Sequence, residues 1–120
     1  MEKGITGYRD LKVWQRAYEL TLTLYRITKK FPKEELFGLT SQIRRASASV
    51  PANIAEGYER KHRKEYLQFL FVAKGSLGEL DTFLLLARDI GYLHLQEFEH
   101  AYNIKQETMK MLQGLIKSLS

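Results

Sequence analysis

The segment from Tyr66 to Ala87 constrains the fold more than any other part of the chain. Its apolar residues recur at alternating spacings of four and three, in the order Tyr66, Leu70, Ala73, Leu77, Leu80, Leu84 and Ala87. This heptad pattern extends over three repeats, and it predicts a long amphipathic helix rather than a strand. Gly91 supplies a stop signal, so we expect this helix over residues 63–90.

Three further helices are predicted, over residues 10–30, 39–58 and 95–119. Asp10 is a candidate N-cap of the first, and Pro32 ends it because the residue before a proline avoids the helical conformation. No segment shows the alternation of a strand, and the breaks between the helices are short. The sequence therefore predicts one all-α domain over residues 1–120, an antiparallel up-down-up-down four-helix bundle.

The helix predicted over residues 10–30 has more apolar surface than one core requires. One side carries Val13, Ala17, Leu20, Leu24, Ile27 and Phe31. Nearly opposite lie Leu11, Tyr18, Leu22 and Tyr25. At 100° per residue these groups span roughly 220°, whereas a helix that covers one core needs little more than 100°. We expect the first side to face the core and the second to contact another copy of the chain, in a homo-oligomer.

The helix predicted over residues 39–58 contains Pro51, which lacks a backbone donor for the carbonyl of Ser47. Its expected core stripe is Leu39, Ile43, Ala46, Val50, Ile54 and Gly57, and its flank is unusually small, with Ser47, Ala48, Ser49, Ala52 and Ala55. Two explanations for the nearby polar residues stay open. Asn53 and Glu56 supply the missing partner of that carbonyl, or Glu56 pairs with Arg44 or Arg45 across a subunit contact.

Most catalytic chemistry has no motif in this chain. It has no cysteine, no GxSxG, no P-loop, no GxGxxG and no HExxH, so we expect a protein that is not an enzyme and holds no cofactor. No run approaches the roughly 18 apolar residues of a membrane helix, and the start of the chain has no signal-peptide core. We therefore expect a soluble, cytoplasmic protein without a membrane partner.

Two sets of polar residues lie close to the apolar faces. Glu97 and His100 form one E-x-x-H, the spacing of di-iron bundles, but such a site needs a second E-x-x-H and two more inward glutamates. We expect a surface pair and no metal. Lys74, Asp81 and Arg88 are spaced by heptads near the seam. A buried network and a site are both open, and solvated edges of the seam are the favoured interpretation.

Positive charge is concentrated in the first half of the chain. Residues 1–62 hold 12 Lys and Arg against 7 Asp and Glu, a net of 12 − 7 = +5, whereas residues 63–120 are neutral. The candidate phosphate-contacting residues are Arg44, Arg45, Arg60, Lys61, Arg63 and Lys64. Tyr58 beside them is a candidate for stacking on a base. The alternative is a solvated corner, with salt bridges from the arginine pair to Glu56, Glu59 or a neighbouring subunit.

Two long motifs carry a family resemblance. The segments SQIRRASASVPANIAEG (41–57) and KEYLQFLFVAKGSLGEL (64–80) closely resemble the four-helix bundle proteins encoded in intervening sequences of bacterial 23S ribosomal RNA genes. LKVWQRAYEL (11–20) and the Phe-Pro pair at 31–32 resemble the same family. The resemblance implies small all-α proteins that assemble as ring-like homopentamers. It makes Arg44, Arg45 and residues 53–57 signature positions, and it brings no catalytic role.

A related branch contains the accessory proteins of diversity-generating retroelements. These proteins form basic pentameric barrels and work with a reverse transcriptase and nucleic acid. Two functional hypotheses follow for this chain. The first is a non-enzymatic oligomer that binds nucleic acid, structured RNA above all, through repeated basic patches. The second is a protein-interaction scaffold or adaptor, such as a reverse-transcriptase accessory protein.

Overall fold

The structure, a computed structural model, describes residues 4–120, which form four α-helices and no strand. The helices are α1 (Lys12–Ile27), α2 (Leu39–Tyr58), α3 (Arg63–Ile90) and α4 (Leu95–Leu119). Single 3-10 turns cover Tyr8–Asp10, Thr28–Lys30 and Lys33–Glu35. The all-α prediction is confirmed, and α2, α3 and α4 coincide with the predicted ranges.

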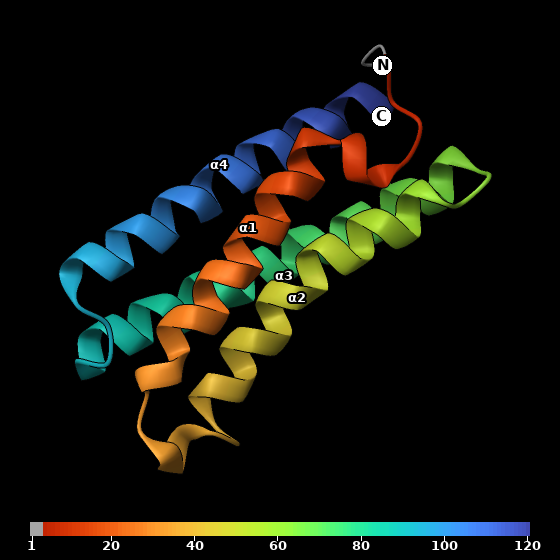
Figure 1. The fold of residues 1–120 in the computed structure, drawn as a ribbon. Coiled ribbons are helices and arrows are strands. Elements are labelled where there is room, and N and C mark those ends of the chain that lie inside the picture. The colour runs from red at the N-terminus through yellow and green to blue at the C-terminus, as the bar shows by residue number, and fades with distance from the viewer. Residues whose placement is uncertain (1–3) are drawn as a thin grey trace.

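The four helices lie side by side in an elongated bundle that measures 43 × 24 × 21 Å along its principal axes (Figure 1). α1 packs against α2 and α4, and α3 packs against the same two helices. α1 and α3 therefore occupy diagonal positions in the bundle. The beginning of α1 and the end of α4 lie at the same end of the molecule, as the red and blue ribbons show (Figure 1).

The first helix was predicted too long at both ends, although Pro32 stops it as expected. Asp10 is not its N-cap, because the Asp10 carboxylate accepts hydrogen bonds from the backbone N–H and the hydroxyl of Thr6, each at 2.9 Å. Leu11 takes the cap position, without a side-chain hydrogen bond. At the other end the α-helix changes to a 3-10 turn at Thr28, which brings Phe31 into the extended conformation that Pro32 requires. Gly91 has φ = 97°, so the predicted stop after α3 is confirmed.

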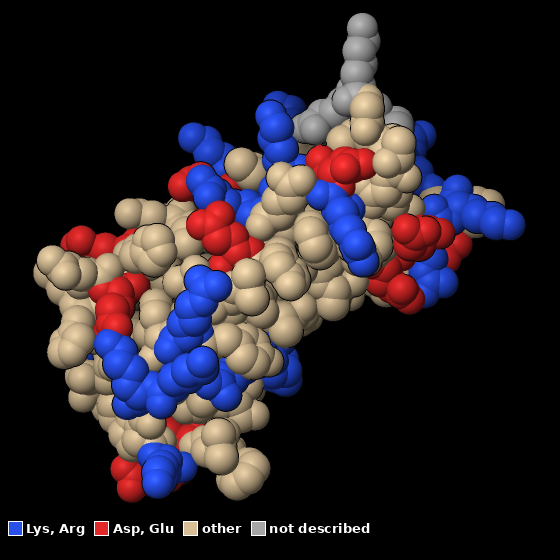
Figure 2. All heavy atoms as spheres, viewed as in Figure 1, with Lys and Arg blue, Asp and Glu red and all other residues tan. Residues whose placement is uncertain are grey.

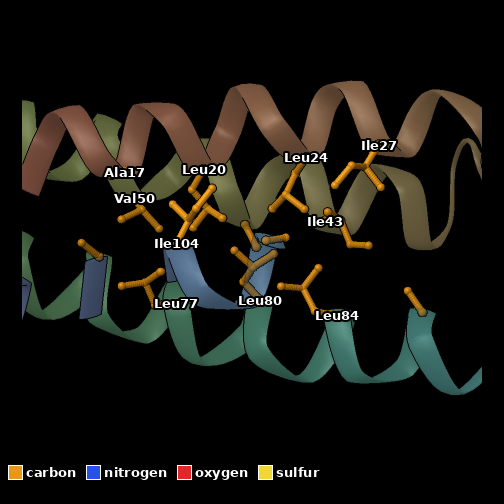
Figure 3. Packing of buried hydrophobic residues seen from close by; sticks show 14 of the residues in the cluster. Ala17, Leu20, Leu24, Ile27, Ile43, Val50, Leu77, Leu80, Leu84 and Ile104 are labelled. Atoms are coloured by element: carbon orange, nitrogen blue, oxygen red, sulfur yellow. The ribbon is translucent and has the colours of Figure 1, made fainter. Parts of the chain in front are cut away.

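The predicted apolar stripes meet in one core. Every residue assigned to the core side of α1, and every residue of the α2 stripe, is buried. Figure 3 shows Leu20 and Leu24 of α1 facing Leu77, Leu80 and Leu84 of α3, with Ile104 of α4 between them. On α4, Met111 is 37% exposed and lies outside this core.

Asp81 is not the solvated edge residue that the heptad spacing suggested. Its carboxylate accepts a hydrogen bond from the ammonium group of Lys105 on α4, whose side chain is only 5% exposed. This bond holds the pKa of Asp81 below its usual range, although burial opposes the effect. Lys74 is exposed, and Arg88 pairs with its neighbour Asp89 at 2.9 Å. An ion pair between α3 and α4 therefore replaces the expected solvated edge at one of the three positions.

The carbonyl of Ser47 obtains its partner from another helix. α2 is helical on both sides of Pro51, and the hydroxyl of Thr21 on α1 lies 2.9 Å from the Ser47 oxygen. The explanation that Asn53 and Glu56 supply this partner was therefore wrong, whereas the pairing of Glu56 across a subunit contact stays a prediction. The Asn53 amide donates to the Ser49 carbonyl at 2.7 Å, and Glu56 pairs with Arg60 at 2.7 Å. The donor lies 26 positions upstream of the acceptor, so local spacing could not reveal it.

Replacing Thr21 by valine should lower the free energy of unfolding by about 1–2 kcal/mol, because a buried carbonyl loses its donor. In a Pro51→Ala background the same substitution should cost much less, since the backbone N–H that alanine restores at position 51 donates to the Ser47 carbonyl. Urea unfolding of the four proteins, followed by circular dichroism, measures this double-mutant cycle. Equal costs in the two backgrounds would contradict the assigned hydrogen bond.

Candidate nucleic-acid interface

The six candidate phosphate-contacting residues form two separate groups. Arg44 and Arg45 lie in the second turn of α2, whereas the segment from Arg60 to Lys64 connects α2 to α3 and begins α3. From Arg45 to the end of α2 at Tyr58 the helix rises about 20 Å. Figure 2 shows Lys and Arg side chains gathered at the α2–α3 corner and, separately, near the far end of α1. The structure therefore does not combine the six into one patch.

Arg44 holds the carboxyl end of α1. Its Nε donates to the Thr28 hydroxyl at 2.9 Å, and its Nη2 donates to the Tyr25 carbonyl at 3.3 Å. The guanidinium also lies 4.8 Å from the centroid of the Tyr25 ring. A cation at this position satisfies carbonyls that the helix leaves without partners and complements the negative end of the helix dipole. Arg44 therefore has a structural role in the single chain.

Arg45 and Arg60 form ion pairs on the surface of the bundle. Arg45 binds Glu79 of α3 at 2.9 Å and the Gln42 side chain at 3.0 Å, so the expected pairing with Glu56 or Glu59 was wrong for it. Arg60 binds Glu56 at 2.7 Å and covers the Phe69 ring at 4.8 Å. Exposed ion pairs contribute less than about 1 kcal/mol. Both arginines can therefore exchange their carboxylate for another anion at little cost.

Lys61, Arg63 and Lys64 have no such partners. All three are exposed, and none forms an ion pair with a carboxylate anywhere in residues 4–120. Arg63 and Lys64 are the first two residues of α3, whose N-cap, His62, makes no side-chain cap hydrogen bond. Positive charge at this end opposes the helix dipole, and Glu65 is the acidic residue of the first turn. Free backbone N–H groups and three cations are thus placed together, as in sites that bind phosphate.

Tyr58 faces the interior rather than the corner. Its ring packs edge-on against Tyr66 of α3, with 6.1 Å between the centroids. The two tyrosines line an apolar cavity of about 510 Å³ between the first residues of α1 and the last turns of α4. Burial raises the pKa of Tyr66 to about 12, so its hydroxyl remains protonated at neutral pH. This packing gives Tyr58 a structural partner within the chain.

A second basic cluster was not predicted from the sequence. Lys29, Lys30 and Lys33 are all exposed around the end of α1, and the signal that marks them is the lysine-rich K-K-F-P-K at residues 29–33. Lys30 pairs with Glu97 of α4. Lysines at the carboxyl end of a helix are favourable for the dipole. This cluster therefore has a structural explanation that the α3 corner lacks.

Glu97 belongs to a helix cap. It occupies the third position of α4 and accepts a hydrogen bond from the backbone N–H of His94 at 3.2 Å, in a capping box. Burial raises the pKa of Glu97, but the bonds from Lys30 and His94 outweigh this effect and keep the pKa below its usual value. His100 is exposed. Within residues 4–120 no three His, Asp or Glu side chains are grouped as a metal site requires.

The four helices and the exposed cations Lys61, Arg63 and Lys64 define a class of small all-α proteins. We call the region of these three cations, between α2 and α3, the basic corner. Across residues 4–120 the structure contains no helix with the length and apolar character of a membrane span. Residues 9–114 match the family of 23S rRNA-intervening sequence proteins, and the chain belongs to this family. The family resemblance read from the sequence is thereby confirmed.

The fold has a counterpart among solved structures. The chain is 25% identical to a protein of unknown function from the S23 ribosomal protein family of Bacteroides thetaiotaomicron. The match covers 88% of this chain and 95% of the other, with a TM-score of 0.81. No curated protein matches the chain.

Proposed function

We propose that this chain forms a non-enzymatic homo-oligomer of antiparallel up-down-up-down bundles that binds nucleic acid through its basic corners. The observation that carries the proposal is the start of α3, where Lys61, Arg63 and Lys64 surround an N-terminus without a side-chain cap. The family's name refers to 23S rRNA, which makes structured RNA the first ligand to test.

Binding of an external anion explains the cations at the basic corner better than a contribution to the stability of the fold does. Arg63 and Lys64 lie at the positive end of the α3 dipole without a carboxylate partner in residues 4–120, so they oppose the stability of the helix. A phosphate at this position reverses the sign of that interaction and also accepts hydrogen bonds from the free N–H groups. Such contacts give affinity with little base specificity.

The proposed assembly favours the same function. Tyr18, Leu22 and Tyr25 of α1 are exposed on the side that the sequence analysis assigned to a second copy of the chain. An oligomer repeats the corner once per subunit, and avidity then exceeds the affinity of one corner without any new type of contact. The resemblance implies five subunits, and light scattering measures this number directly.

The triple variant Lys61→Ala, Arg63→Ala, Lys64→Ala tests the corner. We expect its Kd for a structured RNA to rise at least 10-fold near 100 mM salt. The slope of log K against log salt should become shallower by about 0.7–0.9 for each phosphate that the variant no longer neutralises. Because Arg63 and Lys64 oppose the helix dipole, the variant should also unfold at the same or a slightly higher urea concentration. Weaker binding without loss of stability separates a ligand site from a structural role.

The matched control is Lys74→Ala, Lys110→Ala, Lys117→Ala. These three lysines are exposed elsewhere, so the control lowers the net charge equally, from +5 to 5 − 3 = +2. It should bind RNA nearly as well as the wild type. If both triple variants bind RNA equally weakly, net charge rather than the corner drives binding. If the wild-type oligomer binds no nucleic acid at low salt, the proposal fails and the protein-interaction scaffold replaces it.

A further inference from the structure

The outer face of α3 is apolar at both ends, and its middle carries two glycines beside Glu79 and Thr82. Phe71 and Val72 at one end and Leu86 and Ile90 at the other are 46–53% exposed. Between them lie two exposed glycines, Gly75 and Gly78. Four large exposed apolar side chains on one helix are more than the single scattered apolar residues of an ordinary surface. We call the region around Gly75 and Gly78, which lies between them, the trough.

Nothing within residues 4–120 requires the two glycines. Neither has positive φ, and a Cβ built on either meets no atom within 4 Å. In a helix interior glycine is less favourable than alanine, because it loses more conformational freedom on folding. The single bundle thus bears a cost without a benefit. The close approach of a helix from another molecule to the α3 backbone explains why glycine stands at both positions. A side chain at 75 or 78 would hold that helix away.

The chain itself carries a ridge that fits this trough. On α1, Tyr18, Leu22 and Tyr25 form a line of exposed large side chains, which we call the α1 ridge. Its conformation is set before contact. Trp14 stacks on Tyr18 with 5.0 Å between centroids, and Arg44 covers the Tyr25 ring at 4.8 Å. Preorganised side chains lose little freedom when they bind.

Length and charge agree with this pairing. From Tyr18 to Tyr25 the α1 ridge rises about 10 Å, and the apolar ends of the α3 face at Val72 and Leu86 are about 21 Å apart. The ridge therefore fits between them. Arg26, beside the ridge, is exposed and forms no ion pair within the described residues, whereas Asp89 of α3 keeps 66% of its side chain exposed. Opposite charges thus border the two surfaces.

From these observations we infer that the outer face of α3 receives the α1 ridge of a second copy of this chain. The inference rests on the homo-oligomer proposed above and specifies its contact. α1 and α3 are diagonal in the bundle, so one chain can offer its ridge to one neighbour while its trough receives another. Such a contact is heterologous, and it generates a ring when the rotation between copies closes.

The outer face of α4 is a poorer surface for such a contact than the outer face of α3, because its exposed positions are mostly polar. Among them are Gln96, Glu99, His100, Asn103, Gln106, Lys110, Gln113 and Lys117.

Substitution of the glycines tests the trough. We expect Gly75→Gln with Gly78→Gln to raise the dissociation constant of the assembly at least 10-fold, measured by sedimentation equilibrium. Gly114→Gln is the matched control, because Gly114 is also an exposed helical glycine with free space around its Cβ, but on α4. It should leave the molar mass unchanged. Circular dichroism should show full helicity in all variants, since glutamine is the better helix former.

Mixing two defective chains tests the direction of the contact. Leu22→Lys damages the ridge and the double glutamine variant damages the trough, so each alone should sediment near the monomer mass of 14.0 kDa. Their mixture retains one intact ridge and one intact trough, and it should form a dimer. A monomeric wild type would overturn both the assembly and this contact. An oligomeric wild type that the double glutamine variant leaves intact, or a mixture that stays monomeric, would overturn the contact alone.

Discussion

Replacing Asp81 by asparagine should lower the free energy of unfolding by about 2–4 kcal/mol, although the two side chains have nearly the same shape. The reason lies in its partner. The Lys105 side chain is 5% exposed, and its ammonium group binds the Asp81 carboxylate and lies 4.3 Å from the centroid of the Tyr102 ring. Removing the carboxylate leaves a buried cation without a counter-charge, which typically costs about 3–5 kcal/mol. We use a lower range because Asp81 is 31% exposed.

The controls for this pair use the difference in solvent exposure between Asp81 and Lys105. Lys105→Met should cost less than Asp81→Asn, because the carboxylate that remains reaches water while the ammonium does not. The double variant Asp81→Leu, Lys105→Met should lie within about 1 kcal/mol of the wild type, since apolar replacements of buried ion pairs are often neutral or stabilising. Urea unfolding of the three variants measures these differences. A double variant less stable than Asp81→Asn would contradict the explanation.

The same pair predicts a pH dependence with a definite sign. The pKa of Asp81 is lowered in the folded protein, chiefly by the hydrogen bond from Lys105. Its contribution to stability is therefore complete above the unfolded pKa of about 4 and disappears as the pH falls through the lower folded value. The difference between the wild type and Asp81→Asn should accordingly shrink in acid. A difference that stays constant down to about pH 2 would contradict the pairing.

The core was predictable because its residues follow the period of the helix. Leu70, Leu77 and Leu84 recur every seven residues, and burial of that stripe requires no knowledge of the other helices. Contacts between side chains of different helices could not be predicted from this periodicity. Lys105 lies on α4 among apolar residues, and only the packing of α4 on α3 shows that Asp81 neutralises it. Thr21 was assigned to no partner for the same reason, since its acceptor lies on α2.

The candidate site shows the same limit. Sequence proximity grouped six basic residues, but Arg44 proves to hold the end of α1 and Arg45 binds Glu79 of α3. Adjacent arginines on a helix point in directions about 100° apart, so neighbours in the sequence face different partners. Lys61, Arg63 and Lys64 stay together because they occupy a connection and a first turn. A basic run is thus a better sign of an anion-binding site at the amino end of a helix, where backbone N–H groups are free, than within a helix.

Gly57 lies where α2 and α3 approach each other closely. Gly57→Ala should lower the free energy of unfolding by about 1–2 kcal/mol, even though alanine is the better helix former. A Cβ at this position would lie 2.8 Å from the Cβ of Phe69 and 3.2 Å from the carbonyl oxygen of Tyr66. The oxygen belongs to the α3 backbone, so rotation of a side chain cannot relieve that contact. The two helices must move apart.

The same substitution at Gly114 should have the opposite sign, because a Cβ there meets no atom within 4 Å. Gly114→Ala should raise stability by about 0.5–1 kcal/mol. Comparing the two variants in urea separates the packing cost from helix propensity, which is common to both. Gly57→Val should cost more than Gly57→Ala, since its added methyl groups enter the same contact. If Gly57→Ala instead stabilises the bundle as much as Gly114→Ala does, α2 and α3 are not held in contact at Gly57. The start of α3, with its basic corner, then lacks this anchor.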